Sequence, residues 1–256
     1  MVKPKKHLGQ HFLTDLSIAQ RIVDALSEEQ PDIIEVGAGT GVLTQYLMKR
    51  PNQKLHIIEV DTESVEYLNA TWPQLSENLY FHDFLKYPLE KITEDKFALI
   101  GNFPYNISSQ IFFRVLDYKE QIPEVVGMLQ KEVAERLAAG PGSKTYGILS
   151  VLLQAYYDVE YLFTVDETVF NPPPRVKSAV IRCTRNNVKK LDCNEKLFKQ
   201  IIKACFNTRR KTVRNGCKAL IEDKSVMTDE IFNKRPEQLS VEQFVWLANF
   251  VEKYRR

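Results

Sequence analysis

Several features that would assign this chain to a familiar class are scarce or missing. Its 256 residues include only four cysteines, and no two of them form a CxxC pair. We therefore expect free, reduced thiols and no metal site. No apolar run approaches the roughly 20 residues that a membrane span needs, and the opening MVKPKKHLGQHFL has no apolar core like that of a signal sequence. These absences predict a cytoplasmic protein with no membrane partner.

Acidic residues are scarce toward the C-terminus. Residues 182–219 contain 12 lysines and arginines but only two acidic residues, Asp192 and Glu195. Residues 182–256 carry a net charge of +9, whereas residues 1–181 sum to −7. A basic run of this length is more typical of a surface that binds a polyanion than of a solvated helix face.

Apolar runs that read as strands alternate with helical periods through the first 181 residues. Strands are expected near 32–36, 54–60, 78–84, 96–102 and 124–130, and two further extended runs at 158–165 and 178–184. This alternation predicts an α/β fold with a doubly wound, mostly parallel sheet and an antiparallel edge. Three helical segments follow without strands. We therefore expect a catalytic domain at 1–184 and a small helical domain at 185–256.

The dinucleotide-binding pattern GxGxxG is also missing, although a glycine-rich turn is present. EVGAGTG follows the first buried strand and precedes a helical segment. Its glycines, Gly37, Gly39 and Gly41, permit a sharp turn and a close approach of backbone to ligand. The GxGxG spacing argues against the pyrophosphate pocket of an NAD enzyme.

Acidic residues stand at the ends of the next two expected strands. Glu59, some 20 residues after the turn, could accept both hydroxyls of a ribose. Asp83 could accept from an exocyclic amine. Because the carboxyl ends of parallel strands form one crevice, the turn, Glu59 and Asp83 together predict a nucleoside site.

A glycine turn with a downstream acidic residue looks like the S-adenosylmethionine site of Rossmann-like methyltransferases, and NFPY resembles their N6-adenine signature. More closely, the chain resembles the KsgA-type ribosomal RNA adenine dimethyltransferases from about Gly9 to Asn215. The segments that carry the resemblance are GQHFL, EVGAGTG, GNFPYNIS, LQKEVAERLAAGPGSKTYG, FNPPPRVKSAV and FNTRRKTVRN. It implies dimethylation of the N6 amines of two adjacent adenosines in the 3′-terminal hairpin loop of 16S rRNA.

The NFPY segment, Asn102–Tyr105, suits that chemistry. An adenine N6 amine is a poor nucleophile, so a site must hold the nitrogen as it rehybridises and align it with the methyl group. The Asn102 side-chain carbonyl and the Phe103 backbone carbonyl could accept the amine hydrogens, and Pro104 would stiffen the turn. Tyr105 offers a ring for a flipped-out adenine. We expect no general base.

Two further segments complete the site that the resemblance implies. Phe170, just before the rigid loop NPPPRVK, corresponds to the second face of the adenine sandwich. The segment GQHFL corresponds to one that folds over the methionine part of the cofactor, so Gln10, His11 and Leu13 join the cofactor-binding residues, as does Asn102. His11 departs from the family, which usually has Asn there, and we do not expect it to act as a base.

The basic segment TRRKTVRN is expected to bind RNA phosphates. The segment is expected to be helical, with Arg209, Arg210, Lys211 and Arg214 on one to two turns and close enough to bind several phosphates. Such contacts position RNA without reading its sequence. A basic track toward the adenine pocket could continue through Lys131, Arg136 and Lys144.

Two rival functions remain open at this level. The chain could be a dimethyltransferase of large-subunit rRNA of the antibiotic-resistance type, although AGPGSKTYG and RRKTVRN favour the small-subunit branch. It could also be a non-catalytic RNA-binding factor of ribosome assembly, which the intact candidate catalytic residues disfavour. The favoured interpretation is a monomeric, S-adenosylmethionine-dependent enzyme that acts on immature small ribosomal subunits and contributes to their biogenesis.

Overall fold

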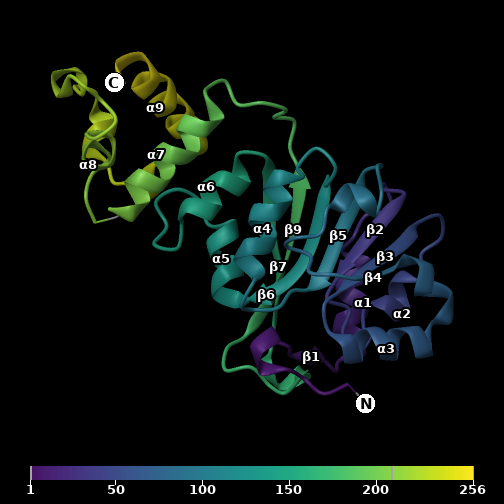
Figure 1. The fold of residues 1–256 in the computed structure, drawn as a ribbon. Coiled ribbons are helices and arrows are strands. Elements are labelled where there is room, and N and C mark those ends of the chain that lie inside the picture. The colour runs from purple at the N-terminus through teal and green to yellow at the C-terminus, as the bar shows by residue number, and fades with distance from the viewer. Residues whose placement is uncertain (1, 209, 256) are drawn as a thin grey trace. The chain divides into compact units, whose positions relative to one another are not determined.

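A seven-stranded sheet runs through the first part of the chain in the computed structural model, which describes residues 2–208 and 210–255 (Figure 1). The strand order is β4-β3-β2-β5-β6-β9-β7. The five strands from β4 to β6 are parallel, and β9 pairs antiparallel with β6. This confirms the predicted α/β sheet with an antiparallel edge. The strands are β2 (Asp32–Val36), β3 (Lys54–Glu59), β4 (Leu79–Phe81), β5 (Phe97–Asn102), β6 (Glu124–Gln130), β7 (Tyr157–Val165) and β9 (Ser178–Arg185).

The chain reverses its direction of travel across the sheet between β4 and β5. It first moves outward from β2 to β3 and β4, and then crosses back to place β5 on the other side of β2. The carboxyl ends of β2 and β5 therefore flank a topological switch point, where doubly wound sheets bind their ligands. The glycine turn follows β2, and Asn102 is the last residue of β5.

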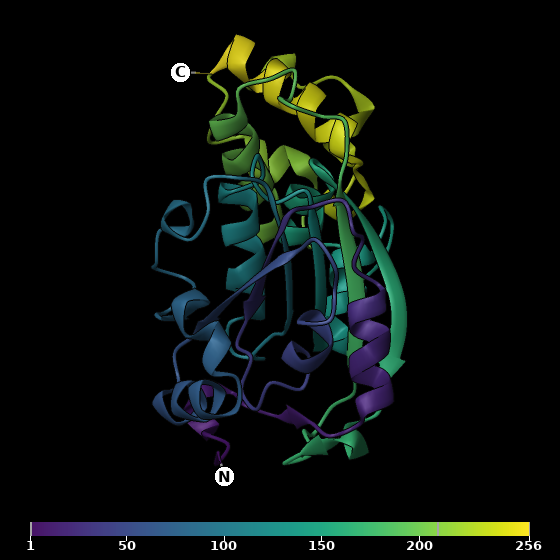
Figure 2. The same ribbon diagram turned by 90° about the vertical axis from the view of Figure 1, so that its right-hand side faces the viewer.

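Helices pack on both faces of this sheet. The helices α1 (Leu16–Asp24), α2 (Thr44–Leu47) and α3 (Thr62–Thr71) share one apolar cluster with alternate strand residues such as Ile57 and Ile100. The opposite side carries α4 (Ser108–Asp117), as Figure 2 shows for α1 and α4. Asp15 caps α1 by accepting hydrogen bonds from the backbone N–H groups of Ser17 and Ile18 at 2.8 and 3.2 Å.

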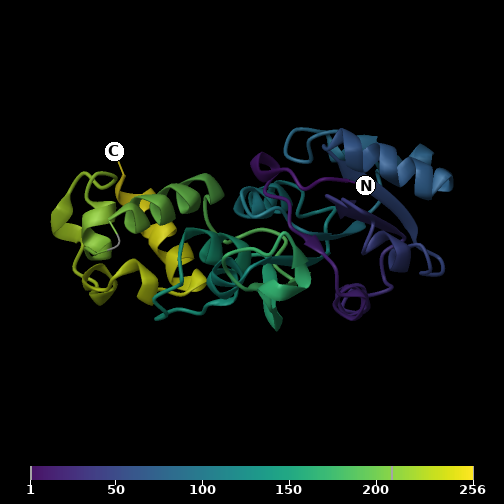
Figure 3. The ribbon, with the colours of Figure 1, turned by 90° about the horizontal axis from the view of Figure 1, so that it is seen from below.

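A two-stranded ribbon joins the N-terminal segment to the loop between β7 and β9. It pairs β1 (Phe12–Leu13) antiparallel with β8 (Phe170–Asn171), so that Leu13 lies opposite Phe170. Figure 3 shows the N-terminal segment crossing this end of the sheet. The pairing places GQHFL beside the triple-proline loop, although about 160 residues separate them in sequence.

The remaining helices belong to a second compact unit. By its internal contacts the chain divides into Met1–Ala134 with Asp158–Arg185 and Glu135–Tyr157 with Asn186–Arg256. The second unit includes residues 135–157, which the sequence assigns to the catalytic domain, because the ring of Tyr146 packs on Phe206 and that ring on Phe244. Its helices are α6 (Ile148–Gln154), α7 (Glu195–Asn207), α8 (Val213–Cys217) and α9 (Val241–Tyr254), and α5 (Lys131–Ala138) spans the division.

The segment TRRKTVRN is not one continuous helix, in contrast to the prediction. The helix α7 ends at Asn207 and α8 begins at Val213, so Arg210 and Lys211 lie in the turn between them. Packing requires the turn, because α8 folds back so closely that a Cβ atom on Gly216 would lie 2.7 Å from the Cα atom of Cys205. Among the described residues, none of the helices has the length and hydropathy of a membrane span.

Candidate active site

The glycine turn after β2 has the conformation that its sequence predicts. Gly37, Gly39 and Gly41 have φ values of 70°, 57° and 74°, which favour glycine. Space is also restricted, because a Cβ atom on Gly39 would lie 2.8 Å from the ring of Phe12, and one on Gly41 would lie 2.2 Å from Trp72. Both the backbone conformation and the packing therefore require glycine here.

Glu59 lies at the end of β3 and points its carboxylate back at this turn. It is buried, and it accepts hydrogen bonds from the backbone N–H groups of Gly39 at 2.9 Å, Val60 at 2.8 Å and Asp61 at 2.9 Å. Burial raises the pKa of Glu59 above its usual range, although the three N–H donors oppose that effect. The N–H donors hold the carboxylate beside a cavity, where its remaining lone pair can accept a ligand hydroxyl.

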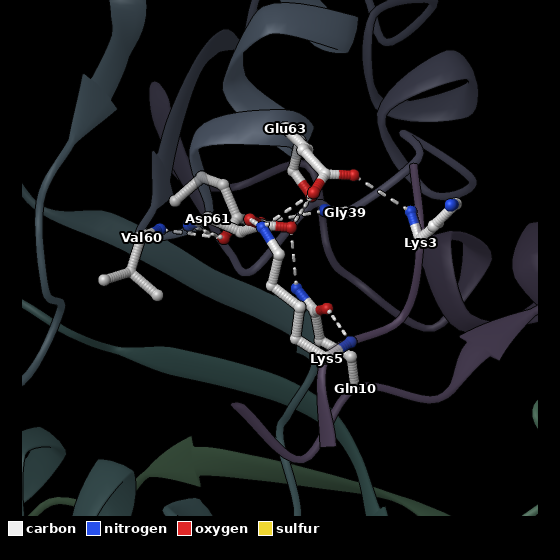
Figure 4. A network of polar contacts seen from close by, with 9 residues as sticks. Lys3, Lys5, Gln10, Gly39, Val60, Asp61 and Glu63 are labelled. Atoms are coloured by element: carbon white, nitrogen blue, oxygen red, sulfur yellow. Dashed lines mark hydrogen bonds and ion pairs between the residues drawn. The ribbon is translucent and has the colours of Figure 1, made fainter. Parts of the chain in front are cut away.

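The N-terminal segment is fastened to the start of α3 by a polar network (Figure 4). Lys5 forms an ion pair with the buried Asp61, whose other oxygen accepts a hydrogen bond from Gln10 Nε2 at 3.2 Å. The Gln10 side-chain oxygen accepts from the Lys5 backbone N–H at 2.8 Å. Although burial alone would raise the pKa of Asp61, the hydrogen bonds from Lys5, Gln10 and Ser64 lower it. Gln10 thus holds this segment across the site.

His11 and Tyr105 form a stacked pair at the centre of the site. Their ring centroids are 5.1 Å apart, with 29° between the ring planes. His11 Nδ1 lies 2.7 Å from the carbonyl oxygen of Pro172, which can only accept, so Nδ1 carries the proton. The Tyr105 hydroxyl bonds to Ser178, and burial raises the Tyr105 pKa. One face of the ring that we expect to stack on adenine is therefore covered by His11.

Asn102 is oriented by a single well-placed acceptor. Its Nδ2 donates to the His11 backbone carbonyl at 2.9 Å. Because that carbonyl cannot donate, the bond fixes which end of the amide faces the N-terminal segment and leaves Oδ1 as an acceptor for another group. The next peptide is held too, since the Phe103 N–H donates to Met128 O at 2.9 Å.

The Phe103 side chain holds the backbone of the NFPY segment in place. It is fully buried and packs edge-on against Phe112, with centroids 6.0 Å apart. Its ring occupies space left by two glycines that pair across β5 and β6, since Cβ atoms on Gly101 and Gly127 would lie within 3 Å of it. The side chain therefore fixes the backbone that carries the predicted carbonyl acceptor.

Two cavities adjoin the His11–Tyr105 pair. A narrow one of about 30 Å³ opens between the glycine turn, Glu59 and the NFPY segment, and residues 9–12 of the N-terminal segment line it as well. A wider one of about 530 Å³ extends from Tyr105 to the triple-proline loop, and Gln10, His11 and Tyr105 line both. The predicted residues that line the narrow cavity are Gln10, His11, Gly37, Gly39, Glu59, Asn102, Phe103, Pro104 and Tyr105.

Four of the predicted catalytic and cofactor-binding residues do not line either cavity. Leu13 and Phe170 face each other across the β1–β8 ribbon and are 3% and 4% exposed, within the apolar core. Asp83 accepts from the Leu85 N–H and pairs with Lys86 at 3.3 Å. Gly41 packs under Trp72. Their expected ligand contacts stay predictions.

Sequence reasoning missed several residues that shape the site. Phe12 covers the glycine turn, Asp61 holds the N-terminal segment, and Ser178 orients Tyr105. The loop 172–176 forms one wall of the wider cavity. Only Asp61 had a local signal, as a second acidic residue two positions after Glu59.

Glu35 is a further buried carboxyl beside the site. Thr44 Oγ1 donates to it at 2.7 Å, and burial, together with the nearby Glu59 charge, raises its pKa to about 8. Between the ordinary value of 4.5 and about 8, the folded state keeps a proton that the unfolded state has released. The folding stability that this carboxyl contributes is therefore lost as the pH rises through that window.

We expect Glu35→Gln, which copies the neutral side chain, to remove this dependence. The free energy of unfolding of the wild type should fall between pH 5 and pH 8 by on the order of a few kcal/mol more than that of the variant. Urea unfolding at both pH values measures the difference, with the exposed Glu28→Gln as control. Parallel pH profiles for wild type and Glu35→Gln would contradict the assignment.

The basic residues of the second unit form a separate candidate surface. Arg210 and Lys211 are exposed in the turn after α7. Arg214 is the second residue of α8, and its guanidinium lies 3.5 Å from Asn233 Oδ1. Arg209, predicted with them, lies outside the described residues. Arg210, Lys211 and Arg214 are called the basic turn below.

The fold and this site define a Rossmann-like, S-adenosylmethionine-dependent methyltransferase. The family model of ribosomal RNA adenine dimethylases matches residues 1–253, and the chain belongs to that family. The relatives that it resembles include proteins called "Ribosomal RNA small subunit methyltransferase A". The one from Phocaeicola vulgatus is 60% identical over 256 residues, covering 98% of this chain and 91% of that protein. The one from Cytophaga hutchinsonii is 58% identical over 252 residues, covering 98% of each.

Solved structures share the fold over almost the whole chain. A dimethyladenosine transferase from Plasmodium falciparum superimposes with a TM-score of 0.79 at 24% identity, covering 95% of this chain and 98% of that one. The structure of the 23S rRNA methyltransferase ErmE gives a TM-score of 0.67 at 24% identity, with 93% and 99% coverage. These likenesses confirm the predicted architecture.

Proposed function

We propose that this protein transfers methyl groups from S-adenosylmethionine to the N6 amines of two adjacent adenosines in the 3′-terminal hairpin loop of small-subunit (16S) rRNA. The observation that carries the proposal is the orientation of Asn102 at the switch point. Its amide nitrogen donates to the His11 carbonyl, so its side-chain oxygen can accept a hydrogen bond from another group. Family membership and the names of the similar proteins support the same reaction.

The residues around the narrow cavity suit the cofactor. Glycines at 37 and 39 leave room for close approach, and the Glu59 carboxylate suits ribose hydroxyls. Gln10 and His11 would cover the methionine part, and Asp83 would accept from the adenine amine. When bound, S-adenosylmethionine supplies an electrophilic methyl group on a sulfonium.

The target adenine would enter from the wider cavity. Asn102 Oδ1 and the Phe103 carbonyl would accept the two amine hydrogens and so direct the nitrogen lone pair toward the methyl group. The Tyr105 ring would replace the stacking that the base loses on leaving the RNA, with Phe170 assigned the second face. The amine becomes acidic only as it gains the methyl group, so its proton can leave to water and the mechanism uses no general base.

Labelled methyl transfer in three parallel reactions tests this proposal. The substrates are small subunits that lack the modification, protein-free small-subunit rRNA, and large subunits. We expect incorporation into the first and, after digestion, recovery of the label as N6,N6-dimethyladenosine. Labelling of large subunits alone would establish the rival reaction. Tight binding to small subunits without methyl transfer would establish a non-catalytic assembly factor.

The basic turn is assigned to RNA phosphates. The double variant Arg210→Ala/Lys211→Ala should weaken RNA binding and flatten the dependence of log Kd on log salt by about one unit for each lost contact. Binding measured at several salt concentrations gives the slope. The matched control removes two exposed lysines of the sheet unit, Lys91→Ala/Lys96→Ala, and should leave it unchanged. Equal slopes for the wild type and the Arg210/Lys211 variant would show that RNA binds to another surface of the protein.

The cellular setting is part of the same proposal. We assign the enzyme to the cytoplasm as a monomer that acts on immature small subunits during their biogenesis. Lys131 belongs to the sheet unit, and Arg136 and Lys144 to the helical one; all three are assigned to the RNA path on charge alone.

A further inference from the structure

One side of α9 carries aromatic residues at every fourth position: Trp246, Phe250 and Tyr254, here called the aromatic stripe. Neighbouring rings touch, with centroids 5.2 Å apart for the first pair and 4.9 Å for the second. The side of α9 that is buried in its own unit is a different set, namely Phe244, Leu247, Ala248 and Val251. Trp246 is 41% exposed, which is unusual for so large an apolar side chain.

Cations accompany these rings. Lys253 Nζ lies 5.1 Å from the centroid of Tyr254. Arg214 of the basic turn lies 5.9 Å from the centroid of Phe232, a buried ring that contacts Trp246 and Phe250 with centroids 6.4 and 5.1 Å apart. The stripe is thus continuous with the basic turn through Phe232.

The exposed Trp246 ring, next to the half-buried Phe250 and Tyr254 and near Arg214 and Lys253, suits the chemistry of single-stranded nucleic acid. Every base has a π-face that stacks on an aromatic ring, and the flanking phosphates require positive charge. A purely apolar protein partner would gain nothing from the Lys and Arg groups beside the rings. Arg214 belongs to the basic run 182–219, which holds 12 lysines and arginines against two acidic residues. Charge complementarity therefore favours RNA as the occupant.

We propose that Trp246 is a stacking platform for an unpaired base of the RNA substrate, with Arg214 and Lys253 beside the adjoining phosphates. The inference rests on the proposed function for the identity of the RNA. It adds a contact to a base face, which the basic turn lacks. Such a contact strengthens binding without adding to its salt dependence, because no charge is neutralised.

Binding of the full chain to protein-free small-subunit rRNA and to a 12-nucleotide unstructured RNA tests this. Trp246→Ala should weaken both complexes about tenfold with the salt slope unchanged, whereas Trp246→Phe, which keeps a π-face, should stay within about threefold of wild type. The matched control is Phe113→Ala on α4, because Phe113 is also 41% exposed. It should bind as the wild type does.

Fluorescence supplies a second readout that a structural role would not move. The chain has two tryptophans, Trp72 and Trp246. Titration with the 12-nucleotide RNA should quench the wild-type emission, since a base stacked on indole quenches it. In Trp246→Phe only Trp72 emits, and the quenching should disappear.

The outcomes separate this inference from the proposed function. Equal RNA affinity of Trp246→Ala and wild type, or quenching that persists in Trp246→Phe, would overturn the stacking platform and leave the methyl transfer untouched. Weaker binding of Trp246→Ala to whole small subunits but not to protein-free rRNA would overturn it in favour of a protein partner. RNA binding that depends on Trp246 in a wild type without methyl transfer would contradict the proposed function alone.

Discussion

Asn102→Ala should lower the turnover of methyl transfer by about 100- to 1,000-fold, the range seen when one group that stabilises a transition state is removed. The physical reason is that the variant loses the oxygen that would hold the amine as its lone pair turns toward the methyl group. Cofactor affinity should change far less. Single-turnover transfer to small subunits lacking the modification measures the rate, and calorimetry with S-adenosylhomocysteine measures cofactor binding.

Asn106→Ala is the matched control for this variant. Like Asn102, Asn106 donates from Nδ2 to a backbone carbonyl of the N-terminal segment, that of His7, at 3.2 Å. It does not line the narrow cavity. If the loss came only from freeing the N-terminal segment, both variants would be impaired alike. A rate for Asn102→Ala within a few fold of wild type would refute the amine-acceptor role.

Glu59→Ala should weaken cofactor binding by about 100-fold or more, because hydrogen bonds to a charged group contribute roughly 1.5–3 kcal/mol each. Calorimetry with S-adenosylhomocysteine measures the change. Burial raises the pKa of Glu59, so this carboxylate becomes protonated at a higher pH than an ordinary one. The affinity of the wild type for the cofactor should therefore begin to fall at a higher pH when the solution is acidified. Protonation removes the acceptor, so the loss occurs toward low pH.

Glu63→Ala separates this effect from a general loosening of the N-terminal segment. Glu63 accepts from the Lys3 N–H at 3.3 Å and pairs with Lys5 at 3.3 Å, but it is exposed and does not line the cavity. Thermal unfolding must accompany both variants, because Glu59 also satisfies three backbone N–H groups. A folded Glu59→Ala protein that binds cofactor as the wild type does would remove Glu59 from the site.

Local sequence patterns were sufficient to predict those elements whose residues are buried as one contiguous segment. The strands β2, β3, β5 and β6 read as apolar runs because parallel strands are covered on both faces. The helical segment expected after the glycine turn is short in the structure, where α2 spans only Thr44–Leu47. One of the three helical segments expected within 185–256 is reduced to α8, since the close packing of Gly216 on α7 decides where the chain turns.

Strand direction also led to a predicted site. The ends of parallel strands meet at one edge, so the glycine turn, Glu59 and Asp83 were predicted together. The structure places Gly37, Glu59 and Asn102 around one cavity, whereas Asp83 pairs with Lys86 and does not line it. The burial of Phe170 was not predicted. The local sequence around a Phe before a proline loop does not differ between a side chain that faces a ligand and one that faces the core.

The sequence by itself therefore determined the sheet, its glycine turn and the strand-end residues, since each depends on neighbours within one element or on the direction of a strand. Only the tertiary structure decided how the site is closed. His11 meets Pro172 across 161 positions, and Asn102 meets His11 across 91. No local pattern records such a contact, because it arises only when the folded sheet brings the N-terminal segment and the proline loop to the same edge.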